Sequence, residues 1–251
     1  MLCFFGKEKN YLIIIPAYNE GESLLEVVSA LHRYRSFVDI LIIDDGSEDQ
    51  TQNIVDDLKG VISIRHKINK GYGATLIEGF NYAIENGYQY AITIDADKQH
   101  NPDDIEKFLS MNKKVNYDIL SGSRYYWSSQ EKHRDAPEDR RRVNLRITQK
   151  INQLTGYELT DAFCGFKLYK VESLRKLHLD EVGYAMPLQL WLEASKNDLK
   201  VVEIPVELIY YKENRGVALY KDPCKRYKYY LTVIEKTTEI YENTSACCTS
   251  R

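Results

Sequence analysis

Short apolar runs alternate with amphipathic segments along the first hundred or so residues, and this alternation limits the folds that the chain can adopt. Four runs have the length and apolar character of buried strands, at residues 11–15, 40–43, 61–65 and 90–94. The segments between them place apolar residues at helical spacing, as in Leu24, Leu25, Val28 and Leu31. This pattern predicts an α/β fold with a parallel, doubly wound sheet flanked by helices.

Polar clusters follow three of these strands. They read Ala17-Tyr18-Asn19-Glu20, Asp44-Asp45-Gly46-Ser47 and Asp95-Ala96-Asp97. Because ligands bind outside the carboxyl ends of parallel strands, the topology is expected to bring these groups to one edge of the sheet. Asn19, and Ser47 or Asp49, are also suited to cap the helices that follow.

Asp95 and Asp97 are separated by one residue, and Gln99 lies two residues further on. Two close carboxylates repel each other, and a hard divalent cation binds carboxylate and amide oxygens together. A polar turn at the end of a strand explains the same residues without a ligand. The second acidic cluster at the same edge favours a cation and nucleotide site. His100 fits a turn best and receives no firm role.

The second half of the chain predicts fewer regular elements. A helix capped by Asn101 is expected through residue 111, and a strand at 118–120 leads to Arg124, whose guanidinium could clamp a phosphate. Residues 125–141 are polar and predict a loop. Helical spacing recurs in Val143, Ile147, Ile151 and Leu154, with Arg142 and Arg146 on another face. A strand at 200–204, a helix from residue 222 and an unstructured tail at 244–251 complete the prediction.

Several function classes find no support in the sequence. The net charge is −3, which does not indicate a nucleic-acid partner. A dinucleotide-binding fingerprint is not complete in Gly71-Tyr72-Gly73, because Leu76 stands in the place of its third glycine. The sequence also contains no P-loop. The two glycines are therefore interpreted as turn residues before a helix. Cys164 has no patterned histidine to activate it and is expected to pack in the core.

The cysteine content and the hydropathy indicate where the protein works. Five scattered cysteines suggest a reduced, cytoplasmic protein, with peripheral contact at the inner face of a membrane left open. We expect no signal peptide, since the first residues lack a basic segment followed by a long apolar one. No apolar run approaches the roughly 18 residues of a membrane span.

Six stretches occur in an order that closely resembles family 2 glycosyltransferases of the GT-A fold. They are IIIPAYNE, LIIDDGSEDQT, NKGYGATLIEGFNYA, ITIDADKQHNPDDI, ILSGSRY and TDAFCGFKLYK. The nearest type is the dolichyl or polyprenyl phosphate mannose synthase. The resemblance implies a Rossmann-like, mostly parallel central sheet with a smaller acceptor-side subregion. It implies one domain over residues 1–243, with a donor half at about 10–124 and an acceptor half at about 125–220.

The resemblance also implies roles for residues. The donor, a GDP- or UDP-linked sugar, would contact Pro16, Ala17, Tyr18, Glu20, Asp45, Gly71, Asp95 and Ala96. Asp97 and Gln99 would hold Mg²⁺ or Mn²⁺ on the diphosphate. Arg124 and Asp161 would serve catalysis, with Asp161 and Gly165 in the acceptor motif. The acceptor would be bound by Arg124, Arg142, Arg146, Arg215 and Lys221.

The expected reaction is inverting transfer of a hexose, mannose or glucose, to polyprenyl phosphate. A phosphate acceptor needs no general base, because its second pKa is about 6. Three departures fall on the acceptor half. The family's Ser-Lys pair is missing near Arg215 and Lys221, Gln189 stands where relatives often carry an acid, and the segment Asp135–Arg142 is unusual.

Three alternatives remain open. One is transfer to a sugar or glycan hydroxyl with Asp161 as the base. Another is a nucleotide-sugar-binding protein without turnover. The third is a sugar-1-phosphate nucleotidyltransferase, which the absence of a Gly-rich opening after the first strand disfavours.

Overall fold

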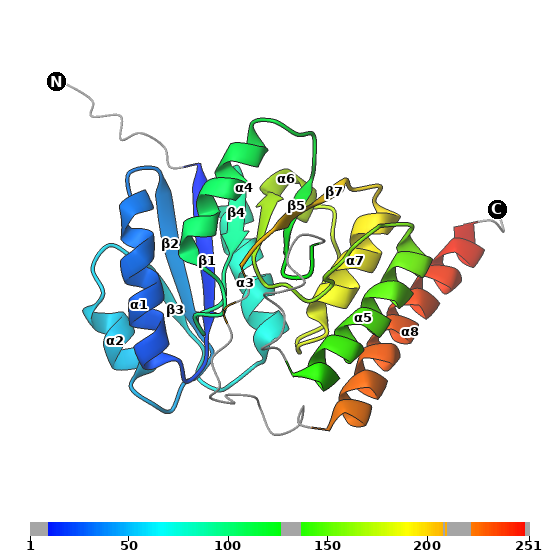
Figure 1. Ribbon diagram of the computed structural model, residues 1–251, viewed down its shortest axis with the longest axis horizontal. Coiled ribbons are helices and arrows are strands. Elements are labelled where there is room, and N and C mark those ends of the chain that lie inside the picture. The colour runs from blue at the N-terminus through cyan, green and yellow to red at the C-terminus, as the bar shows by residue number, and fades with distance from the viewer. Residues whose placement is uncertain (1–9, 127–136, 208, 210–221, 249–251) are drawn as a thin grey trace.

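A seven-stranded mixed sheet forms the centre of the molecule in the computed structural model, which describes residues 10–126, 137–207, 209 and 222–248. The strands lie in the order β3-β2-β1-β4-β6-β5-β7 (Figure 1). Their bounds are β1 Tyr11–Ala17, β2 Val38–Asp44, β3 Ile62–Arg65, β4 Tyr90–Thr93, β5 Ile119–Ser123, β6 Lys167–Lys170 and β7 Val201–Pro205. The predicted α/β class with a mostly parallel sheet is therefore confirmed.

One strand departs from the parallel arrangement. β6 runs antiparallel to both β4 and β5, whereas β1, β2, β3 and β4 pair in parallel and β5 pairs in parallel with β7. The sequence did not predict β6, because its four residues, KLYK, have a lysine at each end and only two apolar residues between them, which is too short for an apolar run.

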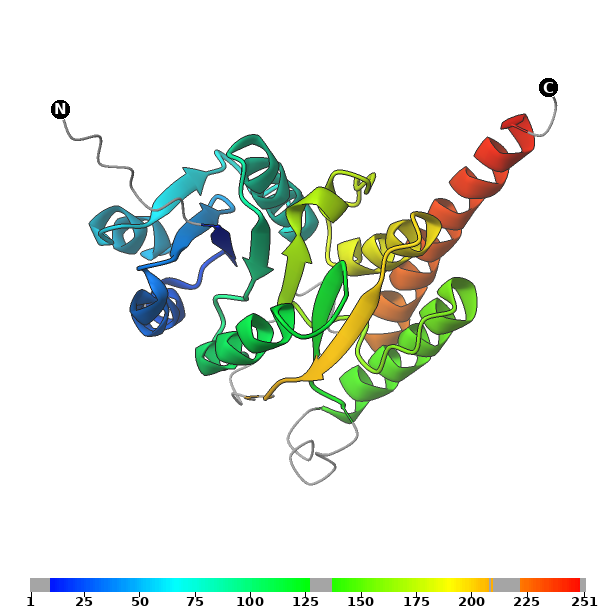
Figure 2. The same ribbon diagram turned by 90° about the horizontal axis from the view of Figure 1, so that it is seen from above.

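The sheet is covered on both faces, as continuous apolar strands require. Along β1, Ile13 and Ile15 face one core cluster, and Leu12 and Ile14 face the other. The first cluster is completed by α1 Gly21–Leu31, α2 Thr51–Asp57 and α4 Ile105–Asn112. The second is completed by α3 Tyr72–Glu85, α5 Glu138–Thr155, α6 Val171–Leu174, α7 Met186–Lys196 and α8 Pro223–Cys248. Figure 2, seen from above, shows helices on both sides of the twisted sheet.

Most helix predictions hold, and the errors have local causes. Asn101 caps the short 3₁₀ helix Pro102–Asp104 by accepting the Asp103 N–H, as predicted. Asn19 does not cap α1: its φ is 55°, and its backbone N–H donates to the Ser47 hydroxyl instead. Leu25 and Leu154 are exposed at 45% and 42%, so the apolar stripes of α1 and α5 are narrower than expected.

The carboxyl-terminal half adds a second layer beside α7. α5 and α8 lie next to each other (Figure 1), and Arg226 of α8 bonds to Asp139 at the start of α5 with an Nη2–Oδ2 distance of 2.9 Å. α8 runs to Cys248, so residues 244–248 are helical where the sequence predicted an unstructured tail. Across the described residues, no helix has the length and apolar character needed to cross a membrane.

Candidate functional site

The carboxyl ends of β1, β2 and β4 meet at one edge of the sheet, as the topology predicted. Ala17 at the end of β1 is in register with Asp44 at the end of β2, and its carbonyl accepts the Asp45 N–H at 2.8 Å. The turns after β1 and β2 are joined by Asn19, whose side-chain oxygen accepts the Glu48 N–H at 2.9 Å. Pro16 and Ala17 are buried, whereas Tyr18 is 36% exposed and presents its ring at this edge.

Asp45 shapes this edge from inside the protein. Its side chain is buried, and its two oxygens accept the backbone N–H groups of Lys70 and Gly71, each at 2.8 Å. Gly71 has a φ of 106°, and a Cβ there would lie 2.4 Å from the Val182 carbonyl oxygen. The glycine is therefore required by both its conformation and its packing. We expect Asp45 to act on a ligand by holding the loop before α3.

Asp95 is held by two side chains at the end of β4. Tyr72 donates its hydroxyl to Oδ1 at 3.0 Å, and His100 Nε2 lies 3.2 Å from Oδ2. Burial alone would raise the pKa of Asp95, but the bonds from His100 and Tyr72 outweigh burial and lower the pKa below its usual value. His100 lies in a bend but is only 2% exposed, and we infer that its ring helps to orient Asp95.

Asp97 carries the opposite perturbation. Burial and the neighbouring Asp95 carboxylate raise the pKa of Asp97 to about 6. Gln99 contacts it twice, because its backbone N–H donates to Oδ1 at 3.0 Å and its amide nitrogen donates to Oδ2 at 2.6 Å. The two residues thus form one unit in which the Gln99 amide oxygen is directed away from the carboxylate. Ala96 is buried between the two acids.

These groups fit a divalent cation held jointly with a ligand. Within the described ranges, no cluster of three or more His, Cys, Asp or Glu side chains could hold a metal ion by itself. Mg²⁺ is commonly bound by one or two carboxylates plus substrate phosphates rather than by a cage of protein ligands. A half-buried carboxylate with a raised pKa, a second carboxylate close to it, and an amide oxygen that rotation of the Gln99 amide would turn toward them form a donor set of this kind.

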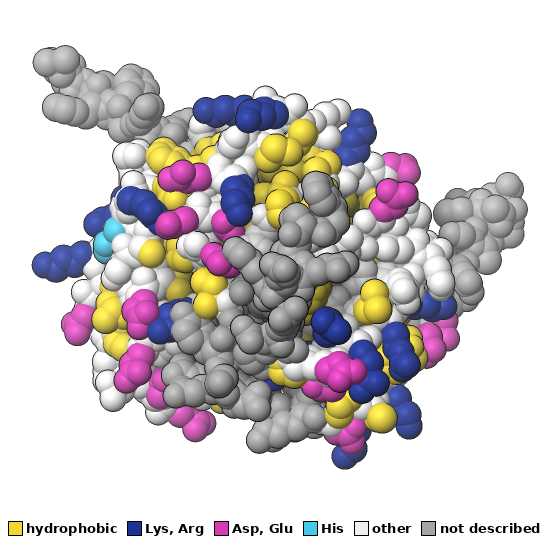
Figure 3. Space-filling model, viewed as in Figure 1, with side chains coloured by type: hydrophobic (Ala, Val, Ile, Leu, Met, Phe, Trp, Pro, Cys, Tyr) yellow, Lys and Arg dark blue, Asp and Glu magenta, His cyan; other side chains and the backbone are white. Residues whose placement is uncertain are grey.

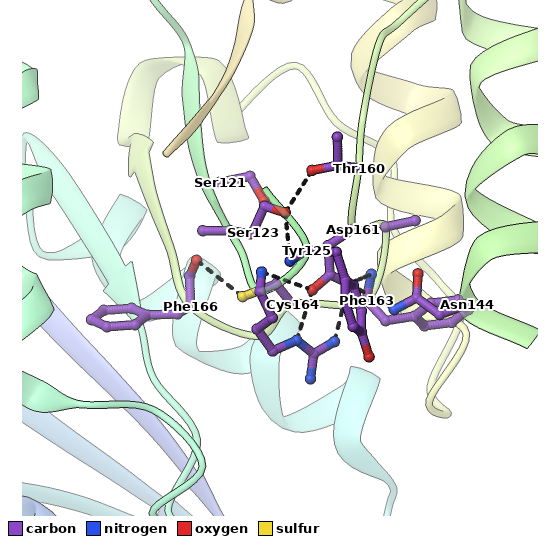
Figure 4. A network of polar contacts seen from close by, with 12 residues as sticks. Ser121, Ser123, Tyr125, Asn144, Thr160, Asp161, Phe163, Cys164 and Phe166 are labelled. Atoms are coloured by element: carbon purple, nitrogen blue, oxygen red, sulfur yellow. Dashed lines mark hydrogen bonds and ion pairs between the residues drawn. The ribbon is translucent and has the colours of Figure 1, made fainter. Parts of the chain in front are cut away.

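Arg124 forms a bidentate ion pair with the buried Asp161, which Figure 4 shows beside Asn144 and Phe163. The Nε–Oδ2 distance is 2.7 Å and the Nη2–Oδ1 distance is 3.0 Å. Asn144 and the Phe163 backbone N–H also donate to Oδ1, at 2.8 Å and 3.2 Å. Burial would raise the pKa of Asp161, but Arg124 and Asn144 outweigh burial and lower the pKa below its usual value. A carboxylate with these contacts is a weak proton acceptor.

Two other predicted acceptor residues, both on α5, are not brought to this pair. Arg142 and Arg146 are exposed on α5, where Arg142 lies 3.7 Å from Glu138. Figure 3 shows Lys and Arg side chains interspersed with acidic ones over α5 and α8. Arg215 and Lys221 lie outside the described residues. Gln189 accepts the N–H groups of Asp180 and Glu181, so its departure from the family pattern concerns the loop at 180–181.

The loop 161–165 is fixed by buried donors that the sequence did not reveal. Trp191 Nε1 donates to the Ala162 carbonyl at 2.9 Å, and the Thr93 hydroxyl donates to the Gly165 carbonyl at 2.6 Å. The buried ammonium of Lys167 donates to the Cys164 carbonyl. Cys164 is fully buried, as predicted, and burial raises the pKa of its thiol to about 12. Trp191 and Thr93 are distant in sequence from this loop, so no local pattern indicates their contacts with it.

A cavity of about 580 Å³ lies between α3 and residues 179–182 and borders Lys70. Its described lining includes Lys70, Glu78, Leu179 and Val182, and contains none of the predicted site residues. We therefore define the candidate site by the residues at the strand ends rather than by this cavity.

Comparisons with known proteins agree with the fold and the motifs. The model of "Glycosyl transferase family 2" matches residues 12–178. The UDP-N-acetylglucosamine–dolichyl-phosphate N-acetylglucosaminyltransferase of Methanococcus voltae is 32% identical over 83% of this chain and 90% of its own length. The polyprenol monophosphomannose synthase of Mycolicibacterium smegmatis is 32% identical over 78% of this chain and 76% of its own.

Among solved structures, glucosyl-3-phosphoglycerate synthase from Mycobacterium tuberculosis, in complex with UDP, superposes with a TM-score of 0.71. The sequence identity is 14%, with 92% of this chain and 80% of that one covered, so the likeness concerns the fold. Together, the family match, the relatives above 30% identity and the ordered motifs show that this chain is a member of glycosyl transferase family 2.

Proposed function

We propose that the protein transfers a hexose from a nucleoside diphosphate sugar to polyprenyl phosphate, with inversion at the anomeric carbon and with Mg²⁺ or Mn²⁺ as cofactor. It would do so as one domain, with a donor half at about 10–124 and an acceptor half at about 125–220. The names of two relatives support the acceptor, because one uses dolichyl phosphate and the other makes polyprenol monophosphomannose.

The donor side rests on the edge formed by β1, β2 and β4. We assign Tyr18 and Glu20, whose carboxylate accepts the Ser23 hydroxyl at 2.7 Å, to contacts with the base and ribose, while Asp45 holds the loop at residues 70–71. Asp97 and the Gln99 amide oxygen would hold the cation, with Asp95 beside them. The cation, when bound, would neutralise the diphosphate as it leaves. A related structure of low identity contains Mn²⁺ together with UDP, which supports a divalent ion at a site of this type.

The state of Asp161 is the observation that carries the choice of acceptor. A hydroxyl acceptor needs a base to take its proton, whereas a phosphate is already ionised near neutral pH. Asp161 is engaged by Arg124, Asn144 and the Phe163 N–H, and its pKa is lowered. We infer that it positions Arg124 rather than acting as a base.

Glu203 does not replace Asp161 in that role. Burial raises the pKa of Glu203, but its carboxylate accepts the Thr160 N–H and hydroxyl, each at 2.7 Å, and the Asp161 N–H at 3.1 Å. Both Glu203 oxygens therefore support the loop that carries Asp161. In the proposed reaction, an acceptor phosphate oxygen attacks the anomeric carbon while the bond to the donor diphosphate breaks, and Arg124 orients the acceptor phosphate.

A donor panel tests the proposal. Purified protein is incubated with polyprenyl phosphate, Mn²⁺ and GDP-mannose, UDP-glucose or UDP-N-acetylglucosamine, and the products are identified by mass spectrometry. UDP-N-acetylglucosamine is included because one relative uses it. We expect a glycosylated lipid phosphate from one donor and none in the presence of EDTA. Binding of a donor without release of nucleoside diphosphate, with every acceptor tried, would instead identify a protein without turnover.

A further inference from the structure

His66 lies buried between two carboxylates from different elements. Its Nδ1 is 2.5 Å from Asp45 Oδ1, and its Nε2 contacts Glu78 Oε2 on α3. The His66 side chain is 1% exposed, so water does not replace either contact. A neutral imidazole has one donor and one acceptor nitrogen, so only the doubly protonated ring donates to both carboxylates. The neighbouring charges are Lys70, whose Nζ lies 3.8 Å from Glu78, and Arg65, which lies 3.7 Å from Asp44.

The same Asp45 carboxylate fixes the backbone of the loop that follows β3. Its oxygens accept the N–H groups of Lys70 and Gly71, and the turn after β2 packs closely on this loop. A Cβ at Gly46 would lie 2.8 Å from the Ile68 carbonyl carbon. Asp45 therefore contacts both ends of the loop at residues 66–71. It contacts the His66 ring at the start of the loop and the Lys70 and Gly71 N–H groups at its end.

We infer that His66, paired with Glu78, is a positioning residue for the donor pocket. This inference rests on the proposed function, because that loop borders the predicted nucleotide site. The contacts run from Glu78 through His66 and Asp45 to Gly71, and the next residue, Tyr72, bonds to Asp95. The Glu78 carboxylate is 36% exposed and outside the predicted site, yet it holds the imidazole ring on which this arrangement depends.

The inference predicts a selective effect on the donor. Loss of the Glu78 charge weakens the orientation of Asp45 and hence of the loop at residues 66–71. The Arg124–Asp161 pair is held by different residues, so binding of the acceptor is expected to remain unchanged.

Glu78→Gln tests this with Glu85→Gln as its matched control, since Glu85 is exposed two turns further along the same helix. Binding of UDP and of GDP, each with Mn²⁺, is measured by calorimetry, together with donor KM, kcat and thermal stability. For Glu78→Gln we expect the Kd of the nucleotide that binds and the KM of the donor each to rise about fivefold, with kcat little changed. For Glu85→Gln we expect no change in any of these values. His66→Gln has both of its N–H donors on one nitrogen, so it cannot span the two carboxylates as Nδ1 and Nε2 do, and it is expected to raise Kd about tenfold or more.

The outcomes separate the inference from the proposed function. If the unsubstituted protein binds nucleotide and Glu78→Gln binds equally well, the inference is wrong and the proposed function stands. A lower melting temperature with unchanged Kd also overturns it, because it shows a structural role alone. If the unsubstituted protein binds neither UDP nor GDP, the proposed function and the inference fall together.

Discussion

Substitution of Gly165 by alanine should disturb the donor site through Asp95. A Cβ at residue 165 would lie 2.2 Å from Asp95 Oδ2 and 2.7 Å from its carboxyl carbon. Non-bonded carbon and oxygen atoms need more than 3 Å, so the carboxylate must move by about 1 Å. Tyr72 and His100 hold that carboxylate at 3.0 Å and 3.2 Å, and such a movement breaks at least one of the two contacts.

A misplacement of about 1 Å at a reacting centre can lower the rate about 100-fold, or about 2.7 kcal/mol of transition-state stabilisation. We therefore expect Gly165→Ala to lower kcat/KM for the donor by about two orders of magnitude. The assay is release of nucleoside diphosphate from the preferred donor in the presence of Mn²⁺ and polyprenyl phosphate. The loss should persist at saturating Mn²⁺.

Gly87→Ala is the matched control. Gly87 has a φ of 73°, and a Cβ there meets nothing within 4 Å. Alanine in this left-handed conformation should cost about 1 kcal/mol of stability and leave kcat/KM unchanged. If Gly165→Ala keeps the unsubstituted kcat/KM, the position of Asp95 does not control the reaction and the reasoning is refuted.

Three further predictions concern other parts of the site. Asp97→Asn should abolish the Mn²⁺ dependence of nucleoside diphosphate binding by calorimetry, because an amide cannot supply the charge; undiminished Mn²⁺ dependence would remove Asp97 from the metal site. Asp161→Asn should lower the free energy of unfolding by about 3 kcal/mol in urea denaturation, since it leaves Arg124 buried without its partner charge; a stable variant with lost kcat would point to Asp161 as the base. Because burial raises the pKa of Cys164 to about 12, its thiol should resist iodoacetamide at pH 8 in the folded protein, whereas the exposed Cys224 should react. Peptide mass mapping measures the labelling of both, and rapid labelling of Cys164 would contradict the prediction.

The parallel half of the sheet could be predicted because its signals are local. Each of β1, β2 and β4 is an apolar run that ends in a polar turn, and the register of Ala17 with Asp44 follows from parallel pairing. The acids at these strand ends were found for the same reason. The antiparallel β6 was missed, since Lys167 is buried by contacts with the distant Trp191 and with the Cys164 carbonyl.

The site residues that escaped prediction act through other residues. His100 looked like a turn residue because only the folded chain brings its ring to Asp95. Tyr72 was read as part of a glycine turn, although its hydroxyl crosses from α3 to the end of β4. Asp161 was a candidate base only in the alternative with a hydroxyl acceptor, and its lowered pKa follows from Arg124, 37 positions earlier in the chain. The sequence shows which side chains are acidic, basic or polar, whereas only the fold determines which of them contact each other.

A comparison of two acceptors tests the central claim most directly. Polyprenyl phosphate and the corresponding polyprenol, which lacks only the phosphate, are offered together to the purified protein with its preferred donor and Mn²⁺. The account predicts that mass spectrometry detects sugar on the lipid phosphate and none on the alcohol, because the described site holds Arg124 for a phosphate and no free carboxylate base beside it. Sugar on the polyprenol, or only on a soluble glycan, would contradict it.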